Sequence, residues 1–224
     1  MRTKKYLSGS WLRLRLHVRS IGLLSVFPFF VVNLLLPLLS FMVYRKEGAT
    51  DAFHLGTIQF GQWLMPLCSI LNVLFVLREY VESPGKEILF VCRNKCKLLD
   101  FLFVFLLSLG NIFILFVVYE LFWPGLFFEF FRIASVCILF FGITYFLTFL
   151  TKTIYMPLMT LLLYTIASIM TYTDRMLFPL YYSNEFVSLP MFVRYYLPFA
   201  LTGVVLLVIG VFINKKKHYD RCTT

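Results

Sequence analysis

Hydrophobic positions along the chain fall into six long runs separated by short polar connections. About 20 apolar residues let a helix cross the hydrocarbon core of a bilayer, and each run approaches or exceeds that length. The alternation typical of a membrane barrel is absent, and lipid tolerates no unpaired backbone. The pattern therefore predicts an all-α polytopic membrane protein with one transmembrane domain over residues 1–224. Its six predicted spans cover residues 21–43, 58–77, 98–119, 127–150, 155–172 and 195–213.

Two of the predicted spans have unusual sequences. The first contains Pro28 and Pro37, and proline inside a helix removes a hydrogen bond and predicts a kink or local unwinding. The fifth reads YMPLMTLLLYTIASIMTYT and is the most polar of the six. Its Thr, Ser and Tyr residues favour a buried or pore-facing helix over a lipid-facing one.

The distribution of Lys and Arg predicts how the spans are oriented. If the N-terminus is cytoplasmic, the cytoplasmic segments hold 16 of these residues and the opposite side holds 5. Because cytoplasmic connections are enriched in Lys and Arg, this ratio places both termini (residues 1–20 and 214–224) and the connection at 78–97 in the cytoplasm.

Two further segments are expected to lie at the membrane surface. Residues 1–20 include WLRLRLHVRS, whose alternation formally resembles a strand; without a pairing partner, we favour an amphipathic surface helix with its arginines at the lipid headgroups. Residues 173–194, on the outer side, are aromatic and broken by Pro179 and Pro190. They are expected to dip into the membrane as one or two re-entrant helices; an aromatic anchor belt is the alternative.

Composition excludes an ordinary soluble domain, since 60% of the residues are hydrophobic and 14% are charged, against about a quarter charged in typical globular proteins. The net charge of +10 is concentrated in the two termini and in the connection at 78–97. Basic clusters at the cytoplasmic ends of spans attract anionic lipid, so the lipid bilayer is the expected partner rather than nucleic acid.

Catalytic and metal-binding motifs are absent from the sequence. It contains no H-E-x-x-H or G-x-S-x-G, and its three histidines lie outside the predicted spans. Cys92 and Cys96 are spaced C-x3-C with no other Cys or His nearby in sequence, which fits two small residues on a helix face better than a zinc site. We therefore expect no catalytic residues and no metal site.

A few polar residues lie within the predicted spans. Glu129 and Arg132 are at i, i+3 near the outer end of the fourth span and can pair with each other. Asn33, Asn72 and Asn111 are interpreted as helix–helix contacts, with pore lining as the alternative.

The connection at 78–97 carries eight of the 32 charged residues. After Lys86, Leu89, Cys92 and Cys96 fall at i, i+3 and i+7, which predicts an amphipathic helix along the inner surface. Its charged residues include glutamates as well as Lys and Arg, and mixed charge suits docking to a protein partner. A solvated loop that only satisfies the charge rule is the alternative.

The chain resembles the membrane subunits of type-2 ABC exporters, which have six spans, cytoplasmic termini and a coupling helix between the second and third spans. The segment that carries the resemblance reads Arg78-Glu79, Gly85, Glu87, Ile88-Leu89, Arg93, Lys95 and Lys97. It departs from the family pattern in two places: Gly85-Lys86 stands where the family commonly has Gly-Thr, and Val91-Cys92 replaces the usual proline.

The resemblance implies that a separate ABC ATPase, present in two copies, docks on the coupling segment. The residues implied in this coupling are Arg78, Glu79, Glu82, Gly85, Lys86, Glu87, Ile88, Leu89 and Arg93. ATP and Mg²⁺ are expected on the ATPase and no cofactor on this chain, which has no G-x-x-x-x-G-K-[ST] phosphate loop. A second membrane subunit, identical or homologous, would complete a pathway lined by the first, second and fifth spans. The candidate lining residues are Asn33, Asn72, Thr160, Tyr164 and Ser168.

The substrate implied is apolar or amphipathic, such as an antimicrobial peptide, a drug or a lipid, and the expected location is a bacterial cell membrane. Two other functions remain open. One is the six-span substrate-binding subunit of a vitamin uptake transporter, although such subunits usually dock through small-residue patches that the first span lacks. The other is an uncharacterised integral membrane enzyme.

Overall fold

A computed structural model describes residues 26–48, 51–82, 97–122, 125–170 and 187–222. All regular secondary structure in these ranges is helical. The predicted surface helix at residues 1–20 lies outside the described residues, as do residues 83–96 of the coupling segment and residues 173–186 of the outer segment.

The first helical column consists of α2 (Phe27–Phe30), the π-helix η2 (Val31–Leu35) and α3 (Leu36–Glu47). The central helices are α4 (Asp51–Val81), α6 (Lys97–Phe122), α7 (Phe127–Thr151) and α8 (Tyr155–Met170). The last helical column consists of α9 (Leu189–Met191), the π-helix η3 (Phe192–Tyr196) and α10 (Leu197–Cys222). The irregularity expected between Pro28 and Pro37 is present as η2, which widens the helix between the two prolines without breaking it.

Five of these segments are long and apolar enough to cross a membrane: 27–46, 56–78, 98–122, 127–151 and 189–214. The chain is therefore a multi-pass membrane protein, and the regular structure of its described residues is helical. The fifth predicted span, 155–172, corresponds to α8, which has 16 described residues. At 1.5 Å per residue α8 is about 24 Å long, shorter than a hydrocarbon core of about 30 Å, so six spans stay a prediction.

Several helices extend beyond the predicted bounds. The second predicted span begins at residue 58, whereas α4 begins at Asp51, three residues after Gly48, whose φ of 72° ends α3. The last column begins at Leu189, so residues 189–194 of the predicted re-entrant segment belong to the helix of the last span. The predicted C-terminal tail is helical as far as Cys222. Hydropathy marks where apolar residues end, but a helix continues through polar residues that do not break it.

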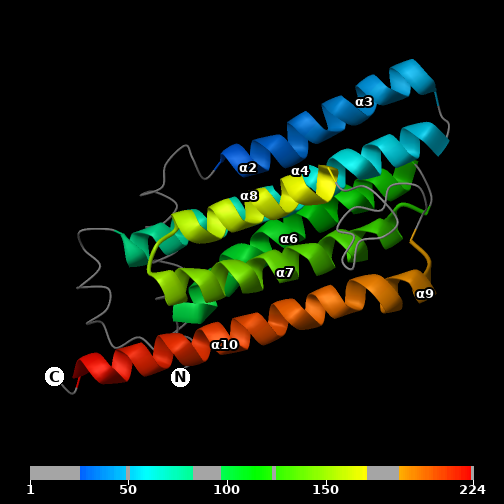
Figure 1. Cartoon of the computed structure of the whole chain (residues 1–224). Coiled ribbons are helices and arrows are strands. Elements are labelled where there is room, and N and C mark those ends of the chain that lie inside the picture. Colours follow the sequence, from blue (N-terminus) through cyan, green and yellow to red (C-terminus); the bar gives the residue numbers. More distant parts are fainter. Residues whose placement is uncertain (1–25, 49–50, 83–96, 123–124, 171–186, 223–224) are drawn as a thin grey trace, which may run out of the picture.

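The helices lie side by side in one bundle and alternate in direction along the chain (Figure 1). The end of α4, the start of α6, the end of α7, the start of α8 and the end of α10 meet at one end of the bundle, which we call the coupling end. We call the other the opposite end. The spans formed by α4 and α7 are each 67% buried, whereas those of the first and last columns are 28% and 22% buried. The two least buried spans lie at the edges of the bundle in Figure 1.

The contact between α7 and α10 is the most extensive between any two described helices. Gly142 of α7 lies against the backbone of Gly203 of α10, and a Cβ atom on either glycine would overlap the backbone of the other helix. Gly210, two turns further along α10, lies against Tyr145 and Phe146. Lipid is as apolar as the side chains, so burial alone does not hold helices together in a membrane. Close backbone approach at these glycines supplies the van der Waals contact that does.

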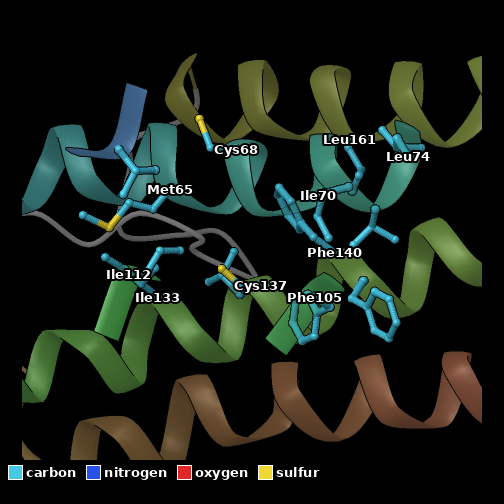
Figure 2. Close-up of a cluster of buried hydrophobic side chains, with 14 of the residues drawn as sticks. Met65, Cys68, Ile70, Leu74, Phe105, Ile112, Ile133, Cys137, Phe140 and Leu161 are labelled. Carbon is cyan, nitrogen blue, oxygen red and sulfur yellow. The ribbon is translucent and has the colours of Figure 1, made fainter. Parts of the chain in front are cut away.

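The core between α4, α6 and α7 is built from apolar and aromatic side chains. Figure 2 shows Met65, Cys68, Ile70 and Leu74 of α4 above Ile133, Cys137 and Phe140 of α7, with Phe105 and Ile112 from α6 beside them. The rings of Phe105 and Phe141 are stacked, with centroids 4.4 Å apart and an interplanar angle of 10°. This core fixes the relative positions of the three helices that carry the candidate sites.

Candidate functional site

The coupling end contains the part of the 78–97 segment that the structure describes. Arg78 is exposed in the last turn of α4, Glu79 lies in the same turn, and Glu82 is exposed directly after the helix. The remaining predicted coupling residues, Gly85, Lys86, Glu87, Ile88, Leu89 and Arg93, lie outside the described residues.

Two hydrogen bonds tie the beginning of this segment to neighbouring helices. The Tyr80 hydroxyl of α4 donates to Oδ2 of Asp100 in the first turn of α6, at 3.2 Å, and both side chains are buried. The Ile154 backbone N–H, just before α8, donates to Oε1 of Glu82 at 3.2 Å. The exit of α4 is therefore joined directly to α6 and to the start of α8.

A row of aromatic side chains extends this connection across the bundle. The Tyr80 and Phe101 rings are 5.0 Å apart, and the Phe101 and Tyr145 rings are 6.0 Å apart, both in edge-to-face geometry. The Asn214 amide of α10 donates to the Tyr145 hydroxyl at 3.5 Å. Contacts at the coupling end thus run from α4 through α6 and α7 to α10.

A second group of polar residues lies within the spans and is called the asparagine cluster: Asn33, Ser69, Asn72, Ser108 and Asn111. The Asn33 amide donates to Asn111 Oδ1 at 3.1 Å, joining η2 to α6. The Asn72 amide of α4 donates to the Ser108 hydroxyl at 3.2 Å, and Ser108 donates in turn to the Val104 carbonyl. The interpretation of the three asparagines as helix–helix contacts is confirmed.

A small pocket of about 10 Å³ lies within this cluster. Its polar lining comes from Ser69 and Asn72 of α4 and from Ser108 and Asn111 of α6, with the Cys68 thiol beside them. The first column supplies an apolar wall of Pro28, Phe29 and Val32. Of the predicted pathway residues, Asn72 lines this pocket and Asn33 is bonded to a lining residue.

The three predicted pathway residues on α8 are not part of this pocket. Thr160 is exposed, and its hydroxyl donates to the Met156 carbonyl at 2.9 Å within the same helix. Tyr164 is half-buried with its ring 6.3 Å from that of Phe140, and Ser168 is buried. The structure thus groups Asn33 with Asn72 and leaves the α8 residues apart from them.

Glu129 and Arg132 form the predicted ion pair at the opposite end of the bundle. The Arg132 Nε and Glu129 Oε2 atoms are 3.2 Å apart, and the two side chains are 0% and 1% exposed. Oε1 of Glu129 accepts a hydrogen bond of 2.8 Å from the Val187 backbone N–H, and the Arg132 guanidinium lies 5.2 Å from the centre of the Tyr196 ring. This pair joins α7 to the beginning of the last column, which favours a structural role.

The sequence-based prediction of sites omitted Ser69 and Ser108. The signal that identifies them is a repeated spacing: α4 contains Ser69-Ile-Leu-Asn72 and α6 contains Ser108-Leu-Gly-Asn111. Residues at i and i+3 lie on one face of a helix, so each Ser-x-x-Asn sequence presents two polar groups together. The pairing of the two faces depends on the packing of α4 against α6.

Within the described residues, no group of three or more His, Cys, Asp and Glu side chains is arranged to hold a metal ion. Comparison of the chain with protein-family models, with curated proteins and with solved structures gives no match.

Proposed function

We propose that the chain is the transmembrane subunit of an ATP-driven ABC exporter. In this proposal it forms half of a pathway for an apolar or amphipathic substrate, and a separate ATPase docks on residues 78–97. ATP and Mg²⁺ bind to that ATPase, of which the complex contains two copies, and a second membrane subunit, identical or homologous, completes the pathway.

The observation that best supports this proposal is the hydrogen bond between Glu82 and the Ile154 backbone. A coupling element must pass a displacement from its docked partner to the helices that line the pathway. Residues 78–97 connect α4 directly to α6. Glu82, near the start of this segment, also accepts a hydrogen bond from the backbone just before α8. A displacement of this segment would therefore move α4, α6 and α8 together.

The buried Tyr80–Asp100 bond has a complementary role in the proposal. It joins the end of α4 to the start of α6, so that the two helices flanking the segment move as one unit. Hydrogen bonds between membrane helices contribute about 0.6 kcal/mol on average and up to about 1.7 kcal/mol. Contacts of this strength hold helices in register and can still be broken during a transport cycle.

The proposed substrate is consistent with the composition of the spans, and the proposed location rests on the resemblance to type-2 ABC exporters. Exposed aromatic and aliphatic residues cover the described helices, and a pathway between such helices suits an amphipathic molecule such as an antimicrobial peptide, a drug or a lipid. In this proposal the complex works in export or immunity in a bacterial cell membrane, with the coupling end in the cytoplasm.

Charge reversal in the coupling segment tests the docking. Glu87→Lys and Arg93→Glu, introduced together into the full-length chain, are expected to abolish co-purification of the ATPase from detergent-solubilised native membranes. Arg45→Glu changes an exposed charge at the opposite end of the bundle and should leave co-purification intact. If the ATPase co-purifies equally with all three chains and retains its transport-linked activity, the coupling assignment is wrong.

A further inference from the structure

The residues that line the pocket in the asparagine cluster take no part in the contacts described at the coupling end. Its polar walls come from the two Ser-x-x-Asn sequences of α4 and α6, and its apolar wall comes from the first column. Asn33, Asn72, Ser108 and Asn111 each lie at least six residues inside the apolar segment that carries it, or about 9 Å at 1.5 Å per residue. The pocket is therefore a polar space within the part of the bundle that faces hydrocarbon.

The polar lining of the pocket suits a water molecule. Two asparagine amides and two serine hydroxyls offer both donors and acceptors, and among the described residues no Asp, Glu, Lys or Arg lines the pocket. A buried water molecule needs two to four polar partners, and the side chains of Ser69, Asn72, Ser108 and Asn111 supply them around the pocket. The volume of about 10 Å³ is close to the lower limit for one water molecule.

The first column covers the pocket from the edge of the bundle. Its span is only 28% buried, and it includes the π-helical turn η2, a feature that is frequent at functional sites. Two side-chain hydrogen bonds fasten it to α6: Asn33 to Asn111 at 3.1 Å and Ser40 to Tyr119 at 3.4 Å. The first of these bonds involves Asn111, which also lines the pocket.

We propose that this pocket is a hydrated site that holds one water molecule, and that the Asn33–Asn111 bond controls access to it. When the bond breaks, the first column moves away from α6, and water-soluble molecules reach the pocket between the two helices. This inference goes beyond the transport proposal, because it requires only the described helices and no ATPase.

The native cysteines provide a probe of water access. Cys68 lines the pocket, whereas Cys137 on α7 is fully buried and does not line it. Methanethiosulfonate reagents react with the thiolate, and a thiol that meets no water stays protonated. Two full-length chains are compared in membranes, each with four of the five cysteines replaced by serine so that only Cys68 or only Cys137 remains.

The expected result is faster labelling of Cys68 than of Cys137 by a small water-soluble methanethiosulfonate. Asn111→Leu should accelerate labelling of Cys68 further, because it removes a bond worth about 0.6–1.7 kcal/mol, equivalent to about a three- to twentyfold change in the open population. Asn33→Leu removes the other partner of this bond, which is exposed, and should accelerate labelling of Cys68 in the same way. The double variant should add little, since both substitutions remove one interaction.

Ile114→Leu, at an exposed position on α6, is the matched control and should leave the rate unchanged. The proposal is overturned if Cys68 is as unreactive as Cys137 in every chain. It is also overturned if Ile114→Leu accelerates labelling as much as Asn111→Leu does. Since no ATPase takes part, loss of ATPase docking would leave these rates unaffected, and the two proposals fail independently.

Discussion

Arg132 and Glu129 are joined within one turn of α7, with Nε and Oε2 3.2 Å apart and both side chains withdrawn from the surface. The two atoms are not aligned as a hydrogen bond, so their attraction comes from opposite charge. Glu129 also accepts the Val187 N–H, and Arg132 lies against Tyr196. This ion pair therefore fixes the position of the chain where it enters its last span.

Removing one partner of this pair should lower the free energy of unfolding far more than removing both. Arg132→Met leaves a buried carboxylate without its counter-charge, which costs about 3–5 kcal/mol. Glu129→Gln combined with Arg132→Met leaves no buried charge and keeps an acceptor for the Val187 N–H. We expect the double variant to regain a large part of the lost stability in a denaturant titration of the purified chain. Additive losses in that double-mutant cycle would contradict the pairing.

The glycine contact between α7 and α10 predicts opposite effects for two similar substitutions. In Gly203→Ala the new Cβ meets the Ile138 carbonyl and the Leu139 backbone, so the helices must separate at a cost of about 1–3 kcal/mol. Gly110→Ala, within α6, has no neighbour within 4 Å and should stabilise the helix by about 0.5–1 kcal/mol. Thermal unfolding in detergent should therefore move down for Gly203→Ala and up for Gly110→Ala. Equal shifts would show that the close approach does not contribute.

Lys152 ends α7 with a left-handed backbone, at φ 60°. L-residues pay about 1–2 kcal/mol for this conformation, whereas glycine does not. Lys152→Gly should therefore raise the thermal midpoint or leave it unchanged, and the β-branched Lys152→Val should lower it. A lower midpoint for Lys152→Gly than for Lys152→Val would mean that the lysine side chain, rather than the backbone, determines this turn.

The Glu82 contact predicts a local change in hydrogen exchange. Glu82→Leu removes the acceptor of the Ile154 N–H, and loss of about 1 kcal/mol of protection gives about fivefold faster exchange of that amide. Glu82→Gln retains an acceptor oxygen and should exchange more slowly than Glu82→Leu. Exchange followed by mass spectrometry of peptides covering the α7–α8 connection measures both. Equal exchange rates in the unmodified chain and both variants would show that Glu82 does not link α4 to the start of α8.

Sequence alone predicted the helical class and the approximate positions of five spans, because a run of apolar residues long enough to cross a bilayer is a local property. The Glu129–Arg132 pair was predictable for the same reason, since its partners are one turn apart. Helices that are apolar on every side carry no stripe that indicates their rotation, so the sequence did not predict which face of α4 meets α6. The Asn72–Ser108 and Asn33–Asn111 bonds follow from that packing.

The contact of α7 with α10 could not be predicted from the hydrophobic pattern either. Gly203 and Gly210 are seven residues apart and share one face of α10, which is a signal for close packing. Their partner helix is determined by the bundle and not by the spacing. The helix boundaries at Asp51 and Leu189 were missed because polar and aromatic residues there continue the helix beyond the apolar segment.

The central claim is that this chain works as a membrane subunit driven by a separate ATPase. Native mass spectrometry of the full-length chain, purified from its own membranes in mild detergent, tests this claim most directly. The account predicts a complex of two membrane subunits and two copies of an ABC ATPase, which loses the ATPase when Glu87 and Arg93 are reversed in charge. A chain that purifies without any ATPase and turns over a substrate alone would contradict it.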